Sequence, residues 1–113
     1  VAFDGIIDLI KSENNAKIHL ISTIVVILVG LKLQFLSIEW LWISLAIAGV
    51  WVAELINTAI EKLTDLISPE QNQIAKKVKD YAAGAVLVMA IWAIFVFCLI
   101  SFPHLWMWLA FSR

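Results

Sequence analysis

Three long apolar runs dominate the sequence. They cover residues 17–35, a stretch that begins at Ile38, and residues 81–102. A helix that crosses a bilayer needs about 20 predominantly apolar residues, and the first run reaches that length only with its flanks included. The pattern predicts three transmembrane helices at about 17–35, 38–58 and 81–102.

The second run continues beyond what a membrane requires. Its helical pattern extends from Ile38 to Ile67, where Ser68 and Pro69 favour a stop. At 1.5 Å per residue this helix is about 45 Å long, against a hydrocarbon core of about 30 Å. We therefore expect residues 59–67 to extend into the cytoplasm, and we expect Pro103 to end the third span.

A shorter helical pattern precedes the three runs, over residues 2–14. Its apolar and charged side chains fall on opposite faces, which is typical of an amphipathic helix that lies along a membrane surface. We predict an all-α membrane protein with one domain over residues 1–113, and from the initial Val we expect that the chain begins inside a longer protein or after processing. The apolar face carries Phe3, Ile6, Ile7 and Ile10, and the polar face carries Asp4, Asp8 and Lys11.

Composition agrees with a membrane protein. Hydrophobic residues make up 63% of the chain, charged residues 15%, and the mean hydropathy is +0.96. Soluble domains have roughly 45 to 50% apolar and about 25% charged residues, so an ordinary soluble domain is excluded. A net charge of −1 gives no basic field for nucleic acid. Cys98 is the single cysteine, which excludes a disulfide framework within the chain.

The basic residues predict the orientation. Six lysines fall on one side of the predicted spans, and only Lys32 and Arg113 fall on the other. Loops rich in lysine and arginine stay in the cytoplasm, so we expect a cytoplasmic N-terminus and an external C-terminus. The six are Lys11, Lys17, Lys62, Lys76, Lys77 and Lys79.

A polar stripe runs along the second predicted helix. Glu54, Asn57, Glu61 and Asp65 are 3, 4 and 4 residues apart, which puts them on one side of a helix. Ionised groups at membrane depth are costly and are usually functional. Glu54 is the deepest of the four, whereas we expect Asp65 to be an ordinary surface acid.

The stripe offers oxygen ligands for a hard divalent cation. Glu54 and Glu61, with an amide between them, would need a third acid, and the candidates are Glu13 and Asp80. Magnesium with a nucleotide is the commonest use of such a site. Lys79 has two open interpretations, a phosphate ligand or an anchor at the membrane interface.

Other catalytic motifs do not occur. The four glycines stand singly, so the sequence has no phosphate-binding glycine loop, and it has no zinc-protease or nucleophile-elbow motif. His19 and His104 are predicted on opposite membrane faces, each as an interfacial residue.

One long stretch carries a family resemblance. Residues 54–87 read ELINTAIEKLTDLISPEQNQIAKKVKDYAAGAVL, and residues 12–20 read SENNAKIHL. Both resemble the bacterial integral-membrane diacylglycerol kinase and undecaprenol kinase family. The resemblance implies a homotrimeric helical bundle in the bacterial inner membrane. It would transfer the γ-phosphate of ATP, with Mg²⁺, to the primary hydroxyl of diacylglycerol or undecaprenol at the cytoplasmic face.

The resemblance also assigns roles by position. Six polar residues of this chain match the family's functional positions. They are Glu54 as the catalytic base, Glu13 and Glu61 as metal ligands, and Asn57, Lys79 and Asp80 as polar residues of the nucleotide and active site.

Two other functions stay open from the residues alone. A small transporter could bind a proton or a cation at Glu54. A non-catalytic assembly subunit could pair the acidic stripe with lysines of a neighbouring subunit. ATP consumption that rises with added lipid would separate a kinase from both.

Overall fold

The computed structural model describes residues 1–111, and within them the chain forms four helices. They are α1 (Ala2–Ser12), α2 (Asn14–Leu33), α3 (Ser37–Ile67) and α4 (Gln73–Phe111). Three of them, α2, α3 and α4, are long and apolar enough to cross a membrane. The predicted all-α fold with three candidate spans is therefore confirmed.

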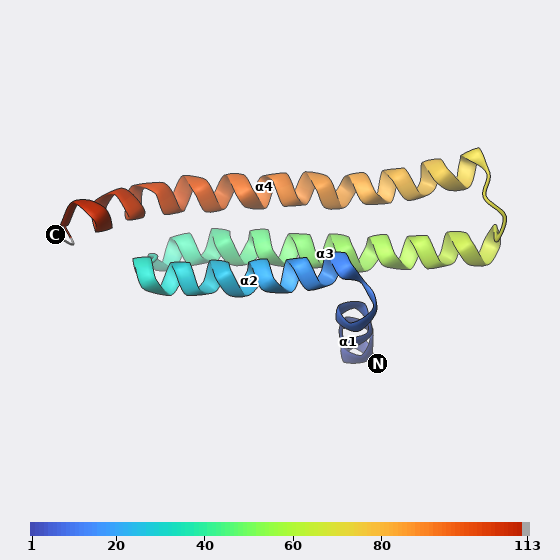
Figure 1. The fold of residues 1–113 in the computed structure, drawn as a ribbon, viewed down its shortest axis with the longest axis horizontal. Coiled ribbons are helices and arrows are strands. Elements are labelled where there is room, and N and C mark those ends of the chain that lie inside the picture. Colours follow the sequence, from blue (N-terminus) through green and yellow to red (C-terminus); the bar gives the residue numbers. More distant parts are fainter. Residues whose placement is uncertain (112–113) are drawn as a thin grey trace.

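The three long helices run side by side along the longest dimension of a molecule that measures 61 × 29 × 22 Å (Figure 1). α1 lies across them near the start of α2 (Figure 1). α3 makes its most extensive contacts with α4, and α2 contacts both. Residues of all three long helices therefore lie beside one another at the same level along the bundle.

A tight turn joins α2 to α3 at the predicted break. Gln34 adopts a left-handed conformation with φ of 57°, and the Phe35 N–H donates to the Gly30 carbonyl at 3.0 Å. Leu36 then precedes the helix, and its N–H donates to the Glu39 carboxylate at 2.8 Å. The Trp40 and Phe35 rings lie directly against the Gly30 backbone, where a side chain would overlap them. The missing side chain of Gly30 therefore lets this hairpin close.

α3 ends at Ile67, as predicted, but α4 begins earlier than the apolar pattern suggested. The third span was predicted at about 81–102, and the polar residues 73–80 before it form the first two turns of α4. The Asn72 side chain accepts a hydrogen bond from the Ala75 N–H at 2.9 Å, which satisfies a free donor at the helix start. Alanine and lysine also favour helix, so this polar segment continues as a helix into the apolar run.

The prediction that Pro103 ends the third span is wrong. α4 continues through Pro103 to Phe111, and Figure 1 shows it as a bowed helix. Proline removes one backbone hydrogen bond, and membrane helices tolerate this where neighbouring groups hold the helix in place. His104, the next residue, has its Nε2 2.6 Å from a Glu39 oxygen and its ring against Phe35.

The core is small for a chain of this length. Its central cluster joins the turn before α3 to α3 and α4, and most other large apolar side chains of the long helices are exposed. Such a surface suits a bilayer or another subunit. The cluster consists of Phe35, Ile43, Ala46 and Val96.

Candidate active site

Glu54 is the most deeply buried acid of α3, with 2% of its surface exposed. Its Oε2 has no hydrogen-bond partner among the described residues. Nε2 of His19, on α2, lies 3.5 Å from this oxygen, within the range of an ion pair. A buried carboxylate without a partner is costly, so this histidine is the natural counterpart of Glu54.

The prediction of His19 as an interfacial residue did not include this contact. Its side chain is 17% exposed and faces α3. α2 and α3 are antiparallel around Leu36, and His19 and Glu54 lie 17 and 18 residues from it. The two residues therefore reach the same depth, a signal that was present in the sequence once the turn had been located.

Neighbouring contacts fix His19 in place. Its ring meets the Trp51 ring edge-on, with centroids 6.3 Å apart. The Trp51 indole N–H donates to the Thr23 hydroxyl at 3.0 Å, and that hydroxyl donates to the His19 carbonyl at 2.7 Å. Two helices thus hold both the ring and the backbone of this residue.

Asn57 and Glu61 form the next part of the stripe. The Asn57 amide nitrogen donates to Glu61 Oε1 at 3.2 Å. The side-chain amide oxygen of Asn57 and the Thr58 hydroxyl are buried without a hydrogen-bond partner among residues 1–111. Together with Glu54 Oε2, these atoms leave several oxygens available on neighbouring turns of α3. Beside them, the half-buried Glu61 carboxylate is a ligand of the kind that Mg²⁺ binds.

Lys79 and Asp80 both have charged partners near the turn that joins α3 to α4. Lys79 Nζ lies 2.5 Å from an oxygen of Asp65, which connects α4 to the end of the stripe. Asp80 instead pairs with Lys76 at 2.9 Å, one turn earlier on its own helix. Asp65 was expected to be an ordinary surface acid, and its contact with Lys79 ties it to the candidate site.

The backbone hydrogen bonds of Glu13 join it to α1 and α2, not to the acidic stripe of α3. It precedes α2 in an extended conformation, and its N–H donates to the Leu9 carbonyl at 3.0 Å. Within the part of the chain that the structure describes, no three His, Cys, Asp or Glu residues are grouped so that they could hold a metal. One subunit therefore does not join Glu13, Glu61 and a third acid into a ready-made metal site.

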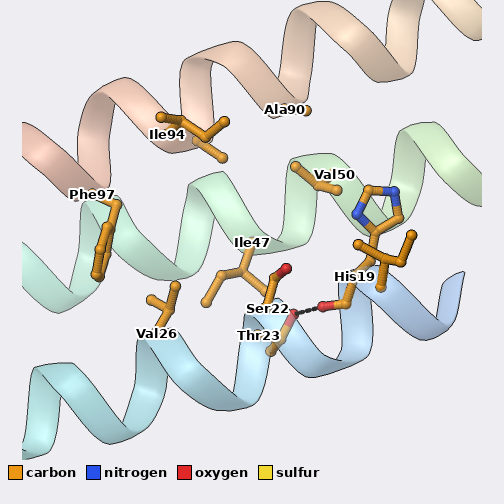
Figure 2. A pocket seen from close by; sticks show the side chains of 11 residues that line it. His19, Ser22, Thr23, Val26, Ile47, Val50, Ala90, Ile94 and Phe97 are labelled. Atoms are coloured by element: carbon orange, nitrogen blue, oxygen red, sulfur yellow. Dashed lines mark hydrogen bonds between the residues drawn. The ribbon is translucent and has the colours of Figure 1, made fainter. Parts of the chain in front are cut away.

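A cavity of about 310 Å³ lies between α2, α3 and α4 on the side of His19 (Figure 2). Its wall is mostly aliphatic, with polar groups where α2 contributes His19, Ser22 and Thr23. Ile47 and Val50 of α3 line it, and α4 contributes Ala90, Ala93, Ile94 and Phe97. The cavity therefore has an apolar interior and one polar edge close to Glu54.

Comparisons with known proteins identify the family of this chain. The family model described as "Prokaryotic diacylglycerol kinase" matches residues 1–101. An undecaprenol kinase of Bacillus subtilis is 39% identical over 101 residues, which cover 89% of this chain and 82% of that protein.

Two diacylglycerol kinases match over smaller parts of their length. The Synechocystis protein is 34% identical over 96 residues, which cover 84% of this chain and 55% of that protein. The Escherichia coli K12 protein is 33% identical over 55 residues, which cover 49% of this chain and 45% of that protein. The family match spans both the acidic stripe of α3 and the start of α4, and the chain therefore belongs to the prokaryotic diacylglycerol kinase family.

Proposed function

We propose that this protein is a membrane lipid kinase that transfers the γ-phosphate of ATP to the primary hydroxyl of undecaprenol or diacylglycerol. The observation that carries this proposal is the buried Glu54 carboxylate, at membrane depth in a family of lipid kinases. The relative that aligns over 82% of its own length is an undecaprenol kinase, which favours the polyprenol as acceptor. Family membership also favours a kinase over a transporter or an assembly subunit.

Glu54 is the proposed base. Its carboxylate accepts the proton of the acceptor hydroxyl while the hydroxyl oxygen attacks the γ-phosphorus, and the bond from that phosphorus to ADP breaks. Phosphoryl transfer depends mainly on positioning and on neutralising charge. A carboxylate that is shielded from water and lies beside the lipid phase meets the acceptor where its hydroxyl enters the membrane surface.

The remaining polar residues would hold the nucleotide. Glu61, oriented by Asn57, and Glu13 are the proposed Mg²⁺ ligands, and Asn57 and Asp80 would be polar residues of the nucleotide and active site. Mg²⁺ would neutralise the phosphate oxygens. Lys79 brings a positive charge to the same end of the stripe and would contact the γ-phosphate.

We further propose a homotrimer in the bacterial inner membrane, with the N-terminus and the active site on the cytoplasmic side. The excess of lysines at that end supports the orientation. A buried acid needs protein or water around it, and one chain offers only three candidate spans, which supports an oligomer. α1 would lie on the cytoplasmic membrane surface through its apolar face.

A kinase assay tests the function. Purified protein in lipid nanodiscs is given labelled ATP and Mg²⁺ with undecaprenol, with diacylglycerol, or with neither. We expect labelled lipid phosphate with at least one lipid, in step with ADP release, and a loss of about 10² to 10⁴ in the rate for Glu54→Gln. ATP consumption that is independent of lipid, or no consumption with either lipid, would contradict the proposal.

A further inference from the structure

We propose that His19 is a positioning residue for Glu54, which holds the catalytic carboxylate in its orientation toward the acceptor hydroxyl. This inference rests on the proposed kinase function and adds a residue to its machinery. Its basis is the pairing of the two side chains across α2 and α3, with His19 Nε2 3.5 Å from Glu54 Oε2.

The environment of Glu54 requires such a partner. The carboxylate is 2% exposed, and an ionised carboxylate in an apolar interior is strongly destabilised unless a donor or an opposite charge compensates it. Among residues 1–111, His19 is the cationic or potentially cationic side chain within ion-pair distance of Glu54. An imidazolium would supply a charge, and a neutral ring with its proton on Nε2 would supply a donor.

The support around His19 suits a positioning role. Trp51 limits the movement of the ring, and the Thr23 hydroxyl joins Trp51 to the backbone of His19. A side chain that must hold another group in a productive geometry is most effective when its own conformation is fixed by its neighbours. This network lies in the N-terminal half of α2, where that helix faces Trp51 and Glu54 of α3.

His19 also lines the cavity between α2, α3 and α4, where it lies beside Ser22 and Thr23 (Figure 2). It therefore has two neighbours, the carboxylate on one side and the cavity on the other. A role through Glu54 lowers kcat, whereas a role only as a wall of the cavity raises the KM for the lipid. These two effects can be measured separately.

Three variants of His19 separate these roles. His19→Gln places an amide N–H at about the reach of Nε2, His19→Asn reproduces only the nearer nitrogen position, and His19→Leu removes the polar group. We expect His19→Gln to keep kcat within about threefold, and His19→Asn and His19→Leu to lower it by about 10- to 100-fold, with the KM for ATP changed by less than about twofold. Because His19→Gln and His19→Asn are both polar amides, their difference is informative even if His19→Leu fails to fold.

A double-mutant cycle tests whether His19 acts through Glu54. In a Glu54→Gln background the carboxylate is gone, so we expect His19→Asn to cause no further loss beyond about twofold. Residual turnover is measured with labelled ATP over long incubations. A full additional loss in that background would overturn the inference and leave the kinase function intact. An unmodified protein that phosphorylates neither lipid would overturn the kinase function itself.

The chain offers a matched control. His104 also pairs with a glutamate from another helix, and its Nε2 lies 2.6 Å from Glu39 Oε1. This second pair lies at the opposite end of the bundle from His19. His104→Leu should lower the thermal midpoint while kcat stays within about twofold. If His104→Leu and His19→Leu lose kcat equally, both effects come from helix packing. If His19→Leu instead raises the KM for the lipid and leaves kcat unchanged, His19 acts only as part of the cavity wall. Either result overturns the positioning role.

Discussion

Burial separates the two glutamates of the α3 stripe. Glu54 is enclosed and faces His19, whereas Glu61 is half-buried and accepts a hydrogen bond from Asn57. The same residue type therefore has two environments, seven residues apart on one helix. An enclosed carboxylate suits proton removal, and a more open one suits a hydrated cation.

A magnesium titration distinguishes these roles. Glu61→Gln should raise the Mg²⁺ concentration needed for half-maximal rate, because an amide oxygen is a weaker ligand, and added Mg²⁺ should recover part of the rate. Glu54→Gln should lower turnover by about 10² to 10⁴ at every Mg²⁺ concentration, because an amide accepts no proton. Recovery of Glu54→Gln by metal would make Glu54 a ligand and not a base.

Asp65 is expected to act through Lys79. Its side chain is 64% exposed, so the pair adds little to stability, yet it fixes the position of an ammonium that we assign to the phosphates. Asp65→Asn should raise the KM for ATP by about threefold and leave the thermal midpoint within about 2 °C. Glu70→Gln, which removes the same negative charge just beyond the end of α3, is the control. Equal effects of both variants would point to general electrostatics and not to the pair.

The sequence located the stripe but not all of its partners. Helical spacing suffices to align Glu54, Asn57 and Glu61, because they lie on a single helix. Contacts between helices depend on which residues of neighbouring helices lie at the same level along the bundle. The pairing of His19 with Glu54 and of Lys79 with Asp65 therefore became apparent only with the α2–α3 and α3–α4 hairpins in place.

At the scale of the helices, apolar length predicted the number of spans well and their ends less well. Hydropathy marks where a helix lies in the membrane, not where its hydrogen bonds stop. α4 therefore starts at Gln73, in a polar segment, and passes through Pro103. The end of α3 was predictable because Ser68 and Pro69 disrupt the helix itself.

Two helical glycines give a matched test of how the helices pack. A methyl group on Gly30 would meet the rigid rings of Trp40 and Phe35, whereas one on Gly49 would meet only the flexible end of Met89. Gly30→Ala should destabilise the protein by about 1 to 3 kcal/mol, because aromatic rings in the turn cannot move aside without disturbing the hairpin. Gly49→Ala should be nearly neutral, since Met89 can adjust and alanine favours helix by up to about 1 kcal/mol. Thermal unfolding in detergent measures both, and equal midpoints for the two variants would contradict this account.

At the scale of the whole molecule, the lysine distribution predicts the orientation in the membrane. A reporter that is active only in the cytoplasm should be active when fused before α1 and inactive when fused after Arg113. The reverse pattern would place the acidic stripe outside, away from cytoplasmic ATP. Activity at both ends would mean an even number of spans, in conflict with the three candidate helices.

The final prediction concerns whether one chain suffices for catalysis. Glu13 precedes α2, and residues 1–111 show no cluster of three metal-binding side chains that includes it, whereas Glu54 is built into the interior of its own chain. If Glu13 of one subunit completes the metal site beside Glu54 of another, a Glu54→Ala chain and a Glu13→Ala chain should be inactive separately. When they are co-assembled, sites that combine an intact Glu54 with an intact Glu13 should form and restore a measurable fraction of the activity.

Variants that share a site within one chain cannot complement each other in this way. Glu54→Ala mixed with Glu61→Ala, both on α3, is therefore the control, and it should remain inactive if these two residues act from the same subunit. Crosslinking of the active preparation should yield trimers. Recovered activity in the control mixture and none with Glu13→Ala would reverse the assignment, with Glu61 and Glu54 acting from different subunits and Glu13 from the same subunit as Glu54.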